Sequence, residues 1–316
     1  MAIINITITF VAFIGLTTLA INLFRFLSWA YSTFLRPPKD LITAYGSWAL
    51  VTGATDGIGK SLAFELASRG LNIVLVGRST TKLESTSKEI RERYGDKIGI
   101  TCIEVDLGGT TGEEIERKVR EGIEGLDVGI LVNNAGVAVK HATFFEEQEV
   151  EDFESVMKVN VVGTTWVTRA VVDGMMKRRR GAVVNMGSGS AVVLPSYPLS
   201  AVYGATKAYI VMFSKCLSLE YRQYGINVQC QIPMLVATKM PRIRSSSFFI
   251  PSTEEFSKAS VRCIGYGHLC QPYWTHAVEG HLLSLLPDGI ANKIVLGHNL
   301  AKRKKALQLG YLKPKQ

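Results

Sequence analysis

The sequence predicts an α/β fold built on a doubly wound parallel sheet and preceded by an N-terminal transmembrane helix. Three observations support this prediction: an uncharged apolar segment near the start, short β-branched runs alternating with amphipathic stretches from Trp48 onward, and a glycine-rich turn after the first run. A chain of 316 residues, 47% of them hydrophobic, can form one large α/β domain and a short extra segment. Residues 1–38 are expected to be the membrane anchor and linker, and residues 39–316 the dinucleotide-binding domain.

The anchor is predicted from the segment Ile3 to Phe24, which has no charged residue. Roughly 20 apolar residues span the hydrocarbon core of a bilayer. A cleaved signal peptide is the alternative, but no basic residue precedes the apolar stretch and no clear small-residue cleavage site follows it. Positive charge lies only on the C-terminal flank, at Arg25, Arg36 and Lys39. By the positive-inside rule, the folded domain should face the cytosol.

The sheet is predicted from six short β-branched runs with helical stretches between them. The expected strands are 48–52, 72–76, 99–105, 128–132, 182–186 and 227–232. Such alternation is typical of βαβ units in a parallel sheet that is covered by helices on both faces. Residues 239–251 break the alternation with three consecutive serines and a proline near each end, so we expect a mobile loop or lid there. A substrate loop is accordingly expected near 239–290.

Charge and cysteine content limit the classes of partner. A formal net charge of +9 suits a surface that meets anions, such as lipid headgroups, a phosphate-bearing cofactor or an acyl-CoA. No nucleic-acid binding is expected, because the chain lacks zinc-finger spacing, a basic region with heptads and an RNA-recognition signature. The five cysteines are scattered without a CxxC pair, which favours a reducing compartment, and no metal site is predicted.

A glycine-rich turn follows the first predicted strand and opens a helix. Such a turn lets the backbone approach a pyrophosphate, whose charge the N-terminus of the helix stabilises. The predicted cofactor contacts in this turn are Gly53, Thr55, Asp56, Gly57, Ile58 and Gly59. A lone glycine motif is weak evidence, but here the strand before it and the helix after it supply the required context.

The end of the second predicted strand indicates which cofactor is bound. A protein that binds NAD usually has an acidic residue there, which holds the ribose hydroxyls. This chain has Arg78 instead, and Lys82 follows one turn later. A guanidinium can hold the additional ribose phosphate, so NADP(H) is the expected cofactor; the alternative is an ordinary solvated arginine.

Tyr203 and Lys207 are four residues apart in a predicted helix and therefore project from one face. An ammonium near a phenol favours the phenolate and lowers the pKa of the tyrosine, which allows acid–base catalysis near neutral pH. This pair alone is a weak motif, since any helix can place a tyrosine and a lysine at this spacing.

Five motifs in this order resemble the short-chain dehydrogenase/reductase family over roughly residues 48 to 240. They are the glycine turn, Asn133-Asn134-Ala135-Gly136, Asn160, a serine after the fifth strand, and the Tyr203–Lys207 pair. The resemblance implies a Rossmann-type sheet and hydride transfer to or from a carbonyl carbon.

The family resemblance also implies residue roles. Tyr203 would transfer the carbonyl proton, Lys207 would hold the nicotinamide ribose and lower the pKa of Tyr203, and Asn160 would support a proton-relay water. Further cofactor contacts are implied at Asp106, Asn133, Ala135, Gly136, Pro233, Val236 and Thr238.

The catalytic serine is ambiguous in this sequence. Counting from Asn185 on the fifth strand gives Ser188, whereas counting back from Tyr203 gives Ser190. We favour Ser188, because distance from a strand end is fixed by rigid geometry while loop length varies. Its hydroxyl would bond the developing oxyanion, and both serines are expected to contact substrate.

The anchor and several short motifs are similar to the membrane-bound branch that holds the 3-oxoacyl-CoA reductases of fatty-acid elongation and the related 17β-hydroxysteroid dehydrogenases. These motifs include Tyr45-Gly46-Ser47-Trp48 and Gly125-Leu126-Asp127-Val128-Gly129. The resemblance implies NADPH-dependent reduction of a long-chain 3-oxoacyl-CoA, with a steroid or sterol carbonyl as the alternative substrate. It also implies the endoplasmic reticulum membrane as location, membrane lipid as a partner, and other elongation enzymes as candidate partners. A non-catalytic scaffold is the third interpretation.

Three further segments leave alternatives open. Arg242 and Arg244 would meet coenzyme A phosphates or only solvent. Residues 302–305, Lys-Arg-Lys-Lys, would meet a lipid surface or only solvent. The apolar stretch 282–286 is too short to span a membrane and is expected to pack on the core or lie at the surface.

Overall fold

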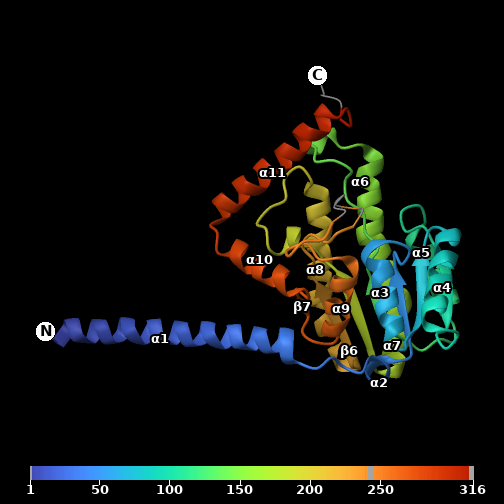
Figure 1. Ribbon diagram of the computed structural model, residues 1–316, viewed down its shortest axis with the longest axis horizontal. Helices are drawn as coiled ribbons and strands as arrows, with labels where there is room; N and C mark the ends of the chain where they lie inside the picture. Colours follow the sequence, from blue (N-terminus) through green and yellow to red (C-terminus); the bar gives the residue numbers. More distant parts are fainter. Residues whose placement is uncertain (1, 239, 241–244, 313–316) are drawn as a thin grey trace. The chain divides into compact units, whose positions relative to one another are not determined.

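The computed structural model describes residues 2–238, 240 and 245–312 of the chain. It divides into two compact units, Met1–Pro38 and Lys39–Gln316 (Figure 1). Arg242 and Arg244, proposed above for coenzyme A, lie outside the described residues.

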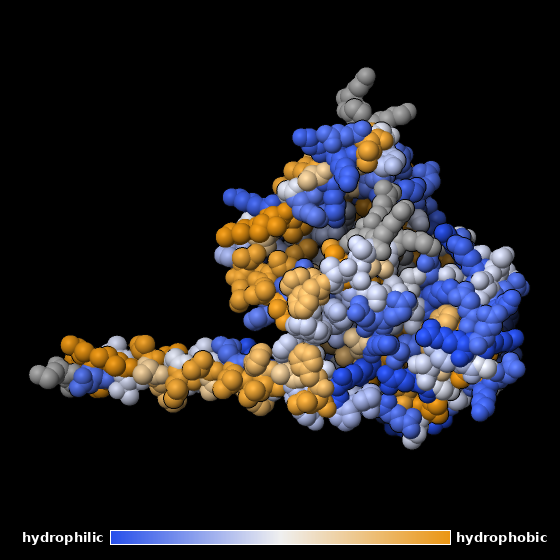
Figure 2. Space-filling view, viewed as in Figure 1, coloured by the Kyte–Doolittle hydropathy of each residue, from blue (hydrophilic) through white to orange (hydrophobic). Residues whose placement is uncertain are grey.

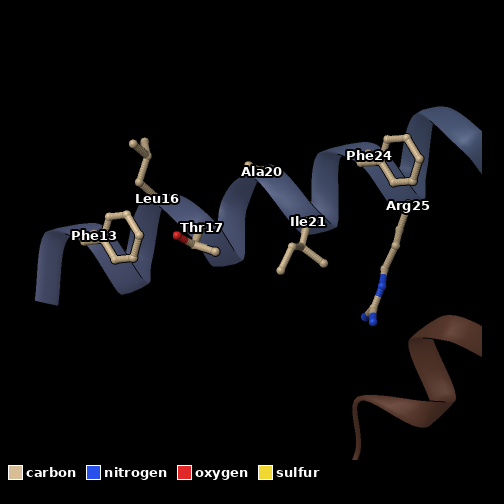
Figure 3. A pocket seen from close by; sticks show the side chains of 7 residues that line it. All are labelled: Phe13, Leu16, Thr17, Ala20, Ile21, Phe24 and Arg25. Atoms are coloured by element: carbon tan, nitrogen blue, oxygen red, sulfur yellow. The ribbon is translucent and has the colours of Figure 1, made fainter. Parts of the chain in front are cut away.

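The first unit is one long apolar helix. Helix α1 (Ala2–Ala30) continues into a π-helical turn, η1 (Tyr31–Leu35). The span Ile3–Leu35 has a mean hydropathy of 2.0 in its most apolar window, and none of that window is buried. By length and composition this helix can cross a bilayer. Figure 3 shows seven side chains along this helix, among which Arg25 is the only charged one.

The second unit contains a seven-stranded parallel sheet, so the predicted doubly wound fold is confirmed. Its strand order is β3-β2-β1-β4-β5-β6-β7. The strands are β1 (Trp48–Thr52), β2 (Asn72–Gly77), β3 (Ile100–Glu104), β4 (Val128–Asn133), β5 (Gly181–Met186), β6 (Ile226–Gln231) and β7 (Leu269–Cys270). The six predicted strands are present within one or two residues of their expected bounds. The seventh, which pairs with β6 through only two residues, was not predicted.

Helices cover both faces of this sheet (Figure 1). After the short α2 (Leu41–Tyr45), the helices are α3 (Gly57–Ser68), α4 (Thr80–Tyr94), α5 (Gly112–Gly122), α6 (Val150–Met157), α7 (Thr164–Arg178), α8 (Ala201–Glu220), α9 (Thr253–Cys263), α10 (Trp274–Ser284) and α11 (Asp288–Gln308). One core cluster contains Leu62 of α3 and Phe256 of α9, and the other contains Ile115 of α5 and Val167 of α7. Two apolar layers, one per face, therefore fix the sheet.

The region near 239–290, expected as a substrate loop, is largely structured where it is described. It includes α9, β7 and α10. Between them and β6, Ser247 and Ile250 form an isolated antiparallel bridge.

The strand order reverses between β1 and β4, and the carboxyl ends of both strands meet at that point. Open α/β sheets bind ligands at such a switch point. Most of the predicted site residues lie in the loops and helices that directly follow the carboxyl ends of the strands.

Candidate active site

The glycine turn after β1 has the geometry of a phosphate cradle. Gly53 and Gly57 have positive φ angles of 65° and 53°, which glycine adopts without strain. A Cβ on Gly59 would lie 2.2 Å from the carbonyl oxygen of Gly53, so no side chain fits there. Asp56 caps α3 by accepting a hydrogen bond of 2.9 Å from the Gly57 amide. The turn and the helix N-terminus behind it therefore fit a dinucleotide pyrophosphate.

The segment after β6 lies against this turn. A Cβ on Gly57 would be 3.5 Å from the Thr238 methyl group. Val236 is buried in the same core cluster as Ala54 of the turn. Two cofactor-binding segments predicted from distant parts of the sequence are thus brought together.

The residues expected at the adenosine end follow β2 and β3. Arg78 and Lys82 are exposed, and within the described part of the chain neither forms an ion pair. Asp106 is also exposed, and its Oδ1 accepts a hydrogen bond of 3.0 Å from the Gly108 amide. An unpaired guanidinium at this strand end fits an additional ribose phosphate.

The Asn133–Gly136 segment connects the sheet to the site. The side-chain Nδ2 of Asn133 donates hydrogen bonds of 2.8 Å to the Thr168 hydroxyl and to the Asn185 side-chain oxygen. These bonds tie β4 to α7 and β5. The Ala135 amide donates to the Thr52 hydroxyl at 3.0 Å. A Cβ on Gly136 would lie 3.5 Å from Lys207 Nζ, so this glycine leaves room for the lysine.

Asn160 lies in a π-helical turn, η3 (Lys158–Gly163), between α6 and α7. Its side chain is buried and is fully engaged with Val137: Oδ1 accepts from the Val137 amide at 2.8 Å, and Nδ2 donates to the Val137 carbonyl at 2.9 Å. Nδ2 also donates to the Thr206 hydroxyl at 3.0 Å. Asn160 therefore fixes the loop after β4 against α8.

Ser188, Tyr203 and Lys207 lie together at the carboxyl end of β5. The Ser188 hydroxyl accepts a hydrogen bond of 2.9 Å from the Ser190 hydroxyl, and it lies close enough to the Tyr203 phenol to act on its pKa. Lys207 Nζ donates to the Met186 carbonyl at 2.8 Å and lies 5.9 Å from the centre of the Tyr203 ring. Of the two candidate serines, Ser188 is the one that influences the pKa of the Tyr203 phenol.

The electrostatics of this group differ in one respect from expectation. Burial raises the pKa of Tyr203 above its usual value, and the influence of the Ser188 hydroxyl offsets only part of that effect. Burial also lowers the pKa of Lys207 to about 8. The net shift of the Tyr203 pKa is therefore upward, opposite to the lowering expected from Lys207. At neutral pH the phenol is protonated, and so is most of the lysine.

Two residues near the site were not found from the sequence. Tyr197 lies with its ring centre 6.1 Å from that of Tyr203, in a loop that helps line a hollow of about 390 Å³ beside Ser190. His276 of α10 is completely buried and holds the segment after β6: Nδ1 accepts from the Met234 amide at 3.3 Å, and Nε2 lies 3.1 Å from the Leu235 carbonyl. Neither position carries a local sequence signal.

Two motifs that suggested the membrane-bound branch lie at the other end of the sheet. A Cβ on Gly46 would meet the Asp127 carboxylate at 2.8 Å, and a Cβ on Gly129 would meet the Tyr45 carbonyl oxygen at 2.3 Å. Arg180 forms an ion pair of 2.9 Å with Asp127. These residues therefore fix the entry of the chain into the domain and do not contact the site.

Comparison with known proteins assigns the family. The model of the family described as short chain dehydrogenase matches residues 47–247. The chain belongs to the short-chain dehydrogenase family. It is 45% identical to a very-long-chain 3-oxoacyl-CoA reductase-like protein of Arabidopsis thaliana, over 93% of this chain and 94% of that protein. It is 40% identical to the human very-long-chain 3-oxoacyl-CoA reductase, over 82% of this chain and 81% of that protein.

Solved structures agree on the fold. A short-chain dehydrogenase from Sphingobium yanoikuyae in complex with NADPH has a TM-score of 0.62 and 28% identity, covering 75% of this chain and 94% of that one. A 7β-hydroxysteroid dehydrogenase has a TM-score of 0.72 and 24% identity, covering 81% of this chain and 99% of that one; this likeness concerns the fold alone.

Proposed function

We propose that this protein reduces the 3-oxo group of long or very-long-chain 3-oxoacyl-CoA to the 3-hydroxyacyl-CoA with NADPH, in fatty-acid elongation. One observation carries the proposal: the Ser188–Tyr203–Lys207 group stands at the carboxyl end of the sheet, beside a glycine cradle. The reductases of that name, at 40% and 45% identity, support the substrate class.

Side chains of this chain would hold the cofactor along the strand ends. The turn at Gly53, Gly57 and Gly59 receives the pyrophosphate, and Arg78 with Lys82 receives the ribose phosphate. Lys207 holds the nicotinamide ribose. The remaining contacts come from Thr55, Asp56, Ile58, Asp106, Asn133, Ala135, Gly136, Pro233, Val236 and Thr238. When bound, NADPH supplies the hydride.

Tyr203 acts as the general acid. Its raised pKa keeps the phenol protonated at neutral pH, so it can donate a proton to the carbonyl oxygen of the substrate. Ser188 donates a hydrogen bond to the same oxygen as negative charge develops there. The cationic Lys207, 5.9 Å from the ring centre, stabilises the phenolate that remains. Asn160 acts as a positioning residue through Val137 and Thr206.

The apolar helix α1 anchors the enzyme in a membrane. We assign that membrane to the endoplasmic reticulum from the anchor and the resemblance to the membrane-bound branch of the family. The basic residues on the C-terminal flank of the helix support a cytosolic reductase domain. Other elongation enzymes are the partners that this role requires. Very long acyl chains partition into lipid, so an anchored enzyme meets its substrate there.

A steroid or sterol carbonyl is the alternative substrate. The chain is 38% identical to hydroxysteroid dehydrogenase-like protein 1 of Gallus gallus, over 79% of this chain and 75% of that protein. The same serine, tyrosine and lysine would serve either carbonyl.

The deciding experiment follows NADPH absorbance with detergent-solubilised enzyme, given a long-chain 3-oxoacyl-CoA in one assay and a 17-ketosteroid in another. Turnover of the thioester alone supports the proposal, and turnover of the steroid alone replaces it with the alternative. NADPH binding without any turnover would favour a non-catalytic scaffold.

A further inference from the structure

The corner between α10 and α11 has an exposed apolar surface. Four aliphatic side chains there are at least half exposed: Leu282 at 57%, Leu285 at 66%, Ile290 at 50% and Ile294 at 54%. We call these four residues the apolar corner. Figure 2 shows hydrophobic side chains gathered over this part of the reductase domain.

Packing within the domain does not require these side chains. The inner face of α11 is formed by buried residues, among them Ala291, Val295 and Asn299. Ile290 and Ile294 stand on the outer face. Apart from the backbone of α11 itself, no atom of the described residues lies within 4 Å of a Cβ placed on the neighbouring Gly297. When a helix is apolar on its outer face as well as on its inner face, the outer face indicates a contact with an apolar surface outside the domain.

The charges of the same region are strongly one-sided. Between residues 280 and 312 the sequence has five lysines and arginines and a single acidic residue, Asp288. Arg303 is held in an ion pair by Glu147, but Lys293, Lys304 and Lys305 are exposed. Lysines beside an apolar helix face are typical of helices that lie in the headgroup layer of an anionic membrane.

We propose that the apolar corner is a second membrane contact of this protein, seated in the interfacial layer of an anionic bilayer. The inference rests on the proposed anchoring by α1, which holds the domain at high local concentration beside lipid. A second copy of the chain is the less fitting occupant, because two lysine-rich corners would repel each other.

The inner face of α11 connects this contact to the site. Asn299 Nδ2 donates to the Pro198 carbonyl at 2.8 Å, and the Asn292 side chain accepts a hydrogen bond of 2.6 Å from Ser196. These bonds hold the loop that carries Tyr197 beside Tyr203. One helix therefore presents an apolar face outward and fixes a wall of the active site inward, which suits a substrate that resides in lipid.

The test uses the full chain in nanodiscs of phosphatidylcholine and phosphatidylserine. The exposed Cys102 and Cys216 are replaced by serine, and one fluorophore is attached to I294C. The matched control is L219C on α8, where the native leucine is 75% exposed. We expect a lipid-borne nitroxide to quench the label at 294 at least about twofold more than the label at 219, and aqueous iodide to show the opposite order. Equal quenching at the two positions would overturn the proposal.

Three controls separate the possible failures. A label at I14C in α1 reports anchoring: without lipid quenching there, the anchoring itself is refuted, whereas quenching at 14 but not at 294 refutes only the apolar corner. Shielding of position 294 that persists in detergent and grows with protein concentration would show that a second copy covers it, against the proposal. Adding K304E and K305E should reduce lipid quenching at 294, while NADPH turnover in detergent verifies that each variant is folded.

Discussion

His276 should make the stability of the domain depend on pH in a way that one substitution removes. Its Nδ1 accepts the Met234 amide proton, so the proton of the neutral ring is on Nε2, facing the Leu235 carbonyl. Burial lowers the pKa of His276 from 6.5 to about 4. Protonation would break the bond to Met234 and leave a buried charge, so it favours the unfolded chain.

The size of this effect follows from linkage. The contribution of the neutral ring is fully present above the unfolded pKa of 6.5 and is lost as the pH falls toward the folded value of about 4. The loss amounts to about 2 kcal/mol at about pH 5, and to about 3 kcal/mol once the pH is below both values.

The assay is urea unfolding of detergent-solubilised protein, followed by tryptophan fluorescence at about pH 7.5 and about pH 5. His276→Gln cannot titrate, so the difference between its two unfolding free energies should be smaller than that of the wild type by about 2 kcal/mol. His281→Gln, at an exposed position on the same helix, should behave as the wild type. The same pH-dependent loss in His276→Gln and wild type would refute the reasoning.

Three other substitutions test separate parts of the site. Gly59→Ala places a Cβ 2.2 Å from the Gly53 carbonyl oxygen, so the dissociation constant for NADPH in a fluorescence titration should rise by about tenfold or more. Gly297→Ala, which has space for a Cβ, should leave this dissociation constant unchanged. Arg78→Asp should lower the ratio of kcat/KM for NADPH to that for NADH by about tenfold or more, and an unchanged ratio would show that another residue binds the phosphate. Asn299→Ala removes the buried donor to Pro198 and should lower the free energy of urea unfolding by about 1–3 kcal/mol and kcat/KM with it; full activity would show that the loop does not need this bond.

The strands and the glycine turn could be predicted because their signals are local. A β-branched run such as 72–76 is buried on both sides of a parallel sheet, and this leaves its mark in the sequence itself. Gly59 is likewise required by a close contact with Gly53, only six residues earlier in the chain. Where neighbours along the chain determine the structure, the prediction and the structure agree.

The parts that were not predicted depend on residues distant in sequence. His276 acts on Met234 across 42 positions, and Asn299 acts on Pro198 across 101. The two-residue strand β7 exists only because it pairs with β6. The electrostatic expectation for Tyr203 failed for a similar reason, since the extent of burial comes from the assembled fold.

The two motifs Tyr45-Gly46-Ser47-Trp48 and Gly125-Leu126-Asp127-Val128-Gly129 correctly indicated the relatives, but they do not act at the site. Close packing of Gly46 on Asp127 and of Gly129 on Tyr45 explains why glycine is needed there. A motif can therefore indicate a branch of a family because of its packing role. The catalytic residues lie at the opposite end of the sheet.

The most direct test of the account compares Tyr203→Phe with Tyr197→Phe, two partly buried tyrosines whose ring centres are 6.1 Å apart. Each variant is assayed for NADPH oxidation with a long-chain 3-oxoacyl-CoA and for NADPH binding by fluorescence. The account predicts that Tyr203→Phe abolishes turnover and leaves NADPH binding nearly intact, because only the transferable proton is lost, and that Tyr197→Phe keeps substantial turnover. Retained turnover in Tyr203→Phe would contradict the assignment of the proton donor and with it the proposed mechanism.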